Sequence, residues 1–112
     1  MLPKLSPNQR GIRVIKAGSN ADNPYSIFNA AALQKAMKLS PAAFKLWAYL
    51  NAHKNEYEFG LSSKDVCEVC AMSKPTYLKA FDALVEAGYL VQVELYPNLI
   101  GYLFVEQGFG GE

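Results

Sequence analysis

The chain has 112 residues, of which 51% are hydrophobic and 12% aromatic, and its formal net charge is +1. This length and composition predict one folded domain with a core of its own and exclude a disordered chain. No apolar run approaches the roughly 18 residues that a membrane-spanning helix requires. A net charge of +1 is low for a nucleic-acid-binding protein, so a basic surface would require an uneven distribution of charge.

Basic residues gather in the first part of the chain. The cations that precede the first acid, Asp22, are Lys4, Arg10, Arg13 and Lys16. Proline and glycine interrupt the same stretch, so we expect residues 1–24 to form a basic, partly flexible arm, with a short strand at 12–15. Such an arm is either a solvated tail or a segment that follows phosphates or enters a minor groove. In the second interpretation Arg10, Arg13 and Lys16 contact DNA.

Two helices are predicted to follow. Residues 28–38 have a helix-forming composition, and Ser40 and Pro41 are placed as the N-cap and first residue of the next helix. Its apolar residues recur at helical spacing and predict a stripe that faces the core, formed by Ala43, Phe44, Trp47 and Leu50. Lys45 and Asn51 lie outside this stripe.

The polar stretch 53–58 predicts a loop. His53, the chain's one histidine, is interpreted as a surface residue, because no nucleophile or orienting partner accompanies it. Residues 59–61 are short and apolar, and we expect a small strand there that pairs with a hairpin near the C-terminus.

Residues 62–90 contain two helix starts separated by room for only a tight turn. Ser62 or Ser63 can cap the first helix, and Ser73 can cap the second, where Pro75 fits the opening turn. Gly88 supplies the left-handed residue that ends a helix. Two strand-like runs follow, 90–95 and 100–106, joined across 96–99. The order of elements is that of a helix-turn-helix followed by a wing.

These residues carry a resemblance to a known family. The run 72–77 (Met-Ser-Lys-Pro-Thr-Tyr), Leu84 and the run 88–90 (Gly-Tyr-Leu) resemble the recognition-helix pattern of bacterial and phage winged helix-turn-helix domains. The likeness is strongest to the N-terminal domain of phage and plasmid replication initiators and of DnaD-like replisome organisers, and looser to GntR- and MarR-type regulators. It implies a mainly α fold with a small β-hairpin wing (α+β) over residues 25–106. The glycine-rich residues 107–112 are expected to form a flexible tail.

The resemblance also implies a DNA-binding surface. The apolar positions of its pattern assign Tyr77, Ala80, Phe81 and Leu84 to the core. The helix that begins at Ser73 would then enter the major groove of double-stranded DNA. The contact candidates on the two helices are Ser63, Lys64, Ser73, Lys74, Pro75, Thr76, Leu78 and Lys79. Leu78 either meets a thymine methyl or belongs to a surface that faces another protein.

Other features leave a second function open. Asp82 and Glu86 lie further along the exposed side of the same helix and would repel phosphates. The wing has no lysine or arginine at its tip, where Tyr96 and Leu99 suit a protein interface. An inhibitor or adaptor of a mobile element that binds a protein through its wing is therefore the alternative, and a homodimer is also left open.

No catalytic residue, metal site or cofactor is predicted. Cys67 and Cys70 form a C-x-x-C pair, but a structural zinc site needs four ligands. We interpret these cysteines, with Val66 and Val69, as small core residues. Paired carboxylates, a nucleophile with its base and a glycine-rich phosphate loop are also missing, so we do not expect an enzyme. Two reduced cysteines and no export signal favour the cytoplasm, and no membrane partner is expected.

Overall fold

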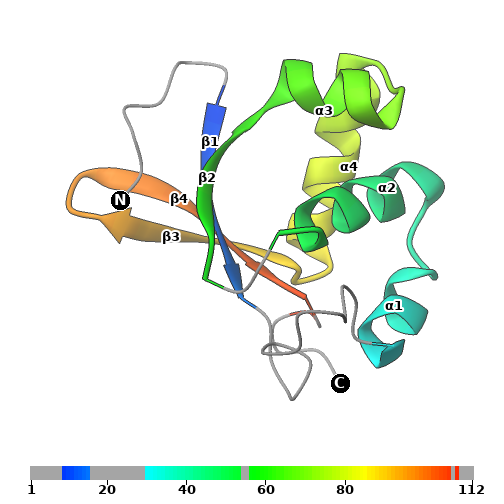
Figure 1. Cartoon of the computed structure of the whole chain (residues 1–112), viewed down its shortest axis with the longest axis horizontal. Helices are drawn as coiled ribbons and strands as arrows, with labels where there is room; N and C mark the ends of the chain where they lie inside the picture. The colour runs from blue at the N-terminus through cyan, green and yellow to red at the C-terminus, as the bar shows by residue number, and fades with distance from the viewer. Residues whose placement is uncertain (1–8, 16–29, 54–55, 107, 109–112) are drawn as a thin grey trace.

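The computed structural model describes residues 9–15, 30–53, 56–106 and 108. Its helices and strands are, in chain order, β1 (Gln9–Ile15), α1 (Ala30–Ala36), α2 (Pro41–Asn51), β2 (Glu58–Ser62), α3 (Ser63–Cys70), α4 (Lys74–Glu86), β3 (Leu90–Tyr96) and β4 (Leu99–Val105). The helices cover one face of a four-stranded sheet, and the β3–β4 hairpin extends beyond them (Figure 1). This α+β arrangement, a helix-turn-helix followed by a hairpin wing, confirms the predicted fold class.

The helix boundaries follow local signals in the sequence. Ser40, Ser62 and Ser73 cap α2, α3 and α4, and each hydroxyl oxygen accepts the backbone N–H three residues later at 3.3 Å. These bonds satisfy amides that the first turn of a helix leaves unpaired. Gly88 has a φ of 87°, as predicted for the residue that follows α4. A helix was predicted at 28–38, and its first two residues, 28 and 29, lie outside the described residues.

The core lies between the helices and the inner face of the sheet. Trp47 of α2 and Phe81 of α4 are among its largest buried side chains, as their spacing predicted. The Trp47 ring stacks on Phe44 with 5.8 Å between centroids, and its indole N–H donates to the backbone carbonyl of Glu106 at 3.1 Å. The second contact ties α2 to the residue that follows β4.

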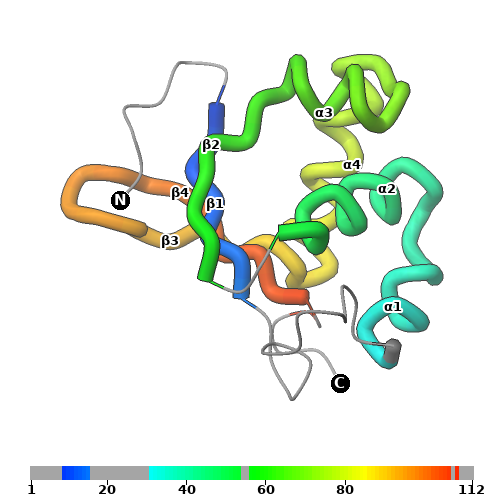
Figure 2. The backbone as a smooth tube through the Cα atoms, viewed as in Figure 1, coloured from blue at the N-terminus to red at the C-terminus, as the bar shows by residue number. Residues whose placement is uncertain are grey.

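The structure corrects two predictions about the sheet. Its strand order is β2-β1-β4-β3, with β1 antiparallel to β2 and parallel to β4 (Figure 2). Residues 9–15 are therefore an interior strand rather than part of an arm, and β2 pairs with β1 instead of with the wing. The reason is the alternation in β1, where Ile12 and Val14 are fully buried and Arg13 between them faces the other side. The remainder of the predicted arm, 1–8 and 16–24, lies outside the described residues, as does most of the predicted tail.

Three side chains near α2 and α3 differ from the predictions in how far they are buried. Asn51 is fully buried, and its amide nitrogen donates to the Glu106 carboxylate at 3.0 Å. His53 is half-buried and stacks on Phe59 with 4.1 Å between ring centroids, so it is not a simple surface residue. Val69 was expected in the core but is 69% exposed. The partner of Asn51 is 55 residues away, whereas His53 stacks on rings of the segment that directly follows it. The exposure of Val69 depends on the direction of α3 relative to α2.

Gly101 is required where β4 passes β1. A β-carbon at this position would lie 2.4 Å from Leu95 Cδ1 and 2.7 Å from the backbone oxygen of Gly11. We expect Gly101→Ala to lower the free energy of unfolding by about 1–3 kcal/mol, because a strand backbone must shift to relieve the contact. Urea denaturation would measure the change, with Ile100→Ala at a 57% exposed neighbour as the control. Equal stability of the two variants would contradict this account.

Glu58 joins three strands on the outer face of the sheet. Its carboxylate accepts hydrogen bonds from the Tyr96 hydroxyl of β3 and from Arg13 Nε of β1. The Tyr96 hydroxyl, together with the Arg13 guanidinium, holds the pKa of Glu58 below its ordinary value of 4.5. This cluster connects β2 to the end of β3 at the tip of the wing.

A pH dependence follows from the lowered pKa of Glu58. A carboxylate whose pKa is lower in the folded state stabilises the fold above its unfolded pKa, and this stabilisation is lost as pH falls through the folded pKa. We therefore expect Glu58→Gln to be less stable than the native chain at pH 7, and the difference to shrink below about pH 4.5. Chemical denaturation across this range would measure it. Glu86→Gln, at an exposed position on α4, is the control, and a difference that grew at low pH would contradict the prediction.

Candidate nucleic-acid interface

The turn between α3 and α4 sets the position of the proposed recognition helix. Ala71 ends α3 in the left-handed conformation, with a φ of 55°. Lys45 of α2 donates from its Nζ to the Cys70 carbonyl at 3.2 Å, which satisfies a backbone acceptor at the end of α3. Ser73 then caps α4, and Pro75 lies in its first turn. The turn is thus held both by its own backbone and by a side chain from α2.

The outer face of α4 changes character along its length. Tyr77, Ala80, Phe81 and Leu84 are buried against the core, as predicted. The opposite side is exposed and carries Lys74, Pro75, Leu78, Lys79, Asp82, Val85 and Glu86. Its first two turns are therefore basic and its last turn acidic. Leu78 is 39% exposed among these charged residues.

The hydroxyl groups of Ser73 and Thr76 at the start of α4 are joined by a hydrogen bond. Ser73 accepts the Thr76 N–H and donates its own O–H to Thr76 Oγ1 at 2.9 Å. Because Thr76 Oγ1 accepts in this bond, its own proton can be donated to an acceptor outside the protein. Ser73 is exposed and Thr76 half-buried, so this pair lies at the surface beside Lys74.

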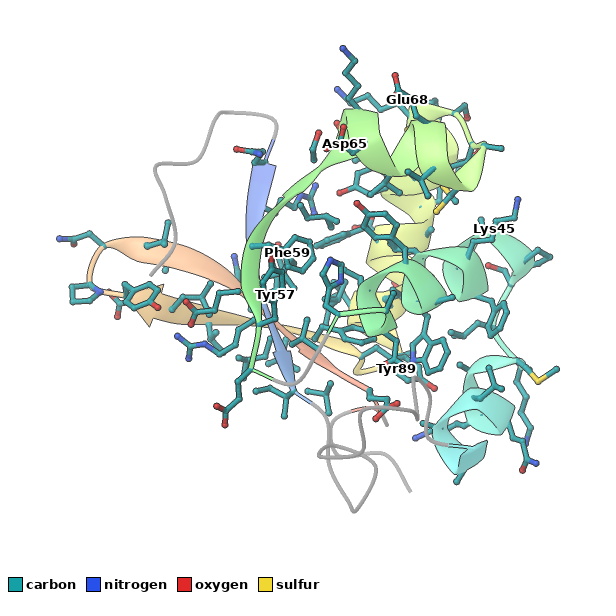
Figure 3. The ribbon with its side chains drawn as sticks, viewed as in Figure 1. Lys45, Tyr57, Phe59, Asp65, Glu68 and Tyr89 are labelled. Atoms are coloured by element: carbon teal, nitrogen blue, oxygen red, sulfur yellow. The ribbon has the colours of Figure 1, made fainter. Side chains whose placement is uncertain are left out.

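The start of α3 lies next to the start of α4. Ser63, Lys64 and Lys74 line one hollow of about 440 Å³, which Cys67 and Glu68 complete. Two lysines from different helices are thus brought together, with one carboxylate beside them. Figure 3 shows Asp65 and Glu68 on the outer side of α3, so the positive charge of this surface is concentrated on only part of it.

The arginines of β1 point to opposite sides of the sheet. Arg10 lies over the Phe81 ring, with its guanidinium carbon 4.0 Å from the ring centroid, and so is close to α4. Arg13 lies on the outer face, bound to Glu58, and is not brought together with the α4 residues. Lys16, the third basic candidate of this segment, lies outside the described residues.

Two residues of this surface were not among the predicted contacts. Lys45 lines a hollow of about 330 Å³ together with Ser73 and Thr76, although it belongs to α2. Val85 extends the exposed side of α4 and is 38% exposed. Lys45 was predicted to lie off the apolar stripe of its own helix. Its closeness to the end of α3 and the start of α4 depends on how the helices pack, which no local pattern in the sequence indicates.

The fold places α2, β2, α3 and α4 in one consecutive unit that ends where β3 begins. Residues 38–90 match the family model of a helix-turn-helix domain. The helix-turn-helix match covers this unit and supports a DNA-binding domain, and such a domain is typically non-enzymatic. Comparisons with curated proteins and with solved structures found no match.

Three further observations concern the cysteines, metal binding and membrane spans. Cys67 and Cys70 are free, half-buried thiols, and burial raises the pKa of Cys70. Among the residues that the structure describes, no group of three or more histidine, cysteine or acidic side chains could hold a metal ion. None of the described helices is long and apolar enough to cross a membrane.

Proposed function

We propose that the chain binds double-stranded DNA through its helix-turn-helix, with the first two turns of α4 in the major groove. Lys74, Thr76 and Lys79 contact base edges or phosphates from within the groove, while Ser63 and Lys64 at the start of α3 bind the phosphate backbone. Ser73 and Pro75 form the end of α4 that enters first. Leu78 lies between the two α4 lysines and can contact a thymine methyl.

The observation that supports this proposal most is the group of exposed lysines on α3 and α4. Within the described part of the chain, no acid lies within ion-pair distance of Lys64, Lys74 or Lys79. Their charges are therefore available to phosphates, and neutralising phosphates releases counterions, which is the main source of affinity for DNA. Arg10 beside Phe81 adds a fourth positive charge near α4, whereas Arg13 contributes only if DNA also reaches the outer face of the sheet.

The acidic end of α4 limits how the helix can lie. Asp82 and Glu86 would repel phosphates, so the helix must enter the groove by its N-terminal end instead of lying along it. The strands of the wing carry Glu94 and no lysine or arginine, which makes the wing a poor phosphate contact. We therefore assign specificity to the first two turns of α4.

For the biological role we propose a replication-initiator-like module or a transcriptional regulator of a phage, plasmid or mobile element. The support for this role is the resemblance of residues 72–77 and 88–90 to the recognition-helix pattern of replication initiators and related regulators. The two roles share the same DNA-binding surface and differ in what is attached to it or recruited by it.

Selection from a random pool of short DNA duplexes at low and moderate salt tests the proposed binding. We expect one motif to be enriched and its binding to weaken steeply as salt rises, because phosphate contacts dominate the affinity. The spacing of half-sites in the motif would reveal a dimer. No binding even at low salt would reject the DNA proposal.

The alternative is binding to a protein through the exposed apolar residues. Leu78 on α4 is 39% exposed, and Ile100 on the wing is 57% exposed opposite the acidic Glu94. A partner bound through such residues would change little in affinity with salt, in contrast to DNA. An Ile100→Asp variant that kept DNA binding intact would separate the wing from the DNA surface.

A further inference from the structure

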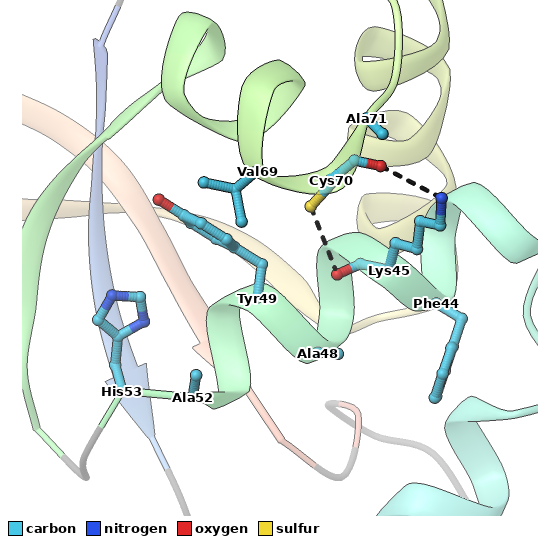
Figure 4. Close-up of a pocket in the computed structure, with 9 residues that line it drawn as sticks. All are labelled: Phe44, Lys45, Ala48, Tyr49, Ala52, His53, Val69, Cys70 and Ala71. Atoms are coloured by element: carbon cyan, nitrogen blue, oxygen red, sulfur yellow. Dashed lines mark hydrogen bonds between the residues drawn. The ribbon is translucent and has the colours of Figure 1, made fainter.

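A groove opens between α2 and the C-terminal end of α3, apart from the outer face of α4. Its volume is about 670 Å³, within the range of sites that bind small molecules in other proteins. Phe44, Ala48 and Tyr49 of α2 form one wall, and Val69 of α3 forms part of the other (Figure 4). Val69 is 69% exposed, so its side chain is accessible to a molecule in the groove.

The polar groups of the groove are unequally distributed. None of the residues that line the groove is acidic, and one lysine, Lys45, lies at one end of it. The Lys45 ammonium group has three N–H donors, and one of them donates to the Cys70 carbonyl. The other two N–H groups can donate to a ligand. Figure 4 shows Lys45 at the end opposite His53, with the Tyr49 ring between them.

The other end of the groove suits an uncharged aromatic group. His53 belongs to a stack of rings with Phe59 and Tyr57, at centroid distances of 4.1 Å and 5.3 Å. Burial, together with the charge of Asp65, raises the pKa of Tyr49 above its ordinary value. Lys45 is the one lysine or arginine among the lining residues, so an anionic group would lie at the Lys45 end.

We propose that this groove binds a small aromatic anion, with a ring between Tyr49 and Val69 and its carboxylate or sulfonate at Lys45. Charge complementarity selects this class, because the site combines aromatic and aliphatic walls with one ammonium group and no lining acid. The proposal goes beyond DNA binding and does not depend on it.

A matched pair of fluorescent probes tests the site on the full chain. 8-Anilinonaphthalene-1-sulfonate is an aromatic anion, and N-phenyl-1-naphthylamine has a similar ring system without the charge. We expect saturable binding of the sulfonate, with energy transfer from Trp47, the chain's one tryptophan, whose ring stacks on the groove residue Phe44. Lys45→Met should lower the affinity for the sulfonate probe by about fivefold and leave the affinity for the neutral probe unchanged.

Two further variants locate the site. Ala52 is exposed at the groove, so Ala52→Phe should fill it without disturbing the core and should abolish binding of both probes. Lys38→Met, at an exposed lysine outside the groove, is the matched control and should bind both probes normally. Circular dichroism verifies that each variant is folded, because the sulfonate also binds partly unfolded chains. Binding that survives Ala52→Phe, or that Lys45→Met weakens equally for both probes, overturns the proposal.

Discussion

Phe81→Ala should lower the free energy of unfolding by about 3–5 kcal/mol, the cost of removing a large buried ring and leaving a cavity. Phe81 is 1% exposed, and its ring meets Tyr102 of β4 edge-on, with 5.0 Å between centroids. Arg10 covers its other side, so the substitution also removes the cation–π contact between β1 and α4. One ring thus links the recognition helix to two strands of the sheet.

Urea denaturation followed by far-ultraviolet circular dichroism would measure this loss of stability. Leu78→Ala provides the matched control, since Leu78 is on the same helix and 39% exposed, and its loss should be much smaller. Trp47→Ala should cost about as much as Phe81→Ala, because Trp47 is fully buried and also donates to the Glu106 carbonyl. A change near zero at Phe81 would show that the buried and exposed faces of α4 are assigned wrongly.

Replacing both Lys74 and Lys79 with alanine should sharply reduce DNA affinity while leaving the fold intact. Both side chains are exposed, so their loss removes positive charge from α4 without opening a cavity. Each phosphate contact contributes about one unit to the slope of log affinity against log salt, so the double variant should flatten that slope by up to about 2.

Fluorescence anisotropy with a labelled duplex at several salt concentrations would measure both quantities. Lys38→Ala serves as the control, because this exposed lysine follows α1 and belongs to neither helix of the helix-turn-helix. The variant should bind DNA like the native chain. If the double variant bound equally well, the contact surface would have to lie elsewhere, and no binding of the native chain even at low salt would favour the protein-partner alternative.

The elements of the helix-turn-helix could be predicted from short stretches of sequence. A serine cap bonds an amide three residues away, and an apolar stripe repeats within one or two helical turns, so both signals are complete within a single helix. Ser40 and Ser73 therefore cap the helices they were predicted to cap, and of the two candidates Ser62 and Ser63 it is Ser62 that caps α3. The division of α4 into buried and exposed sides followed from the same periodicity, and it places Lys74 and Lys79 at the surface.

The arrangement of the sheet could not be predicted in this way. The alternation at 12–15 indicated a strand, but strand order depends on backbone hydrogen bonds between segments that are far apart in the chain. β1 pairs Arg10 with Leu61 and Ile12 with Tyr102, and these pairings separate β2 from the wing. Asn51 was misassigned for the same reason, because its partner Glu106 is 55 residues away.

The sequence by itself determined the helix starts, the buried side of α4 and the two-strand wing, because each is indicated by a pattern within one short stretch of the chain. The tertiary structure decided which strand lies at the centre of the sheet, which arginine approaches α4 and where Lys45 binds. It also formed the groove between α2 and α3, since its walls belong to helices whose relative position is set by the shared core. Local chemistry thus specified the elements, and packing between distant segments specified the surfaces that they form together.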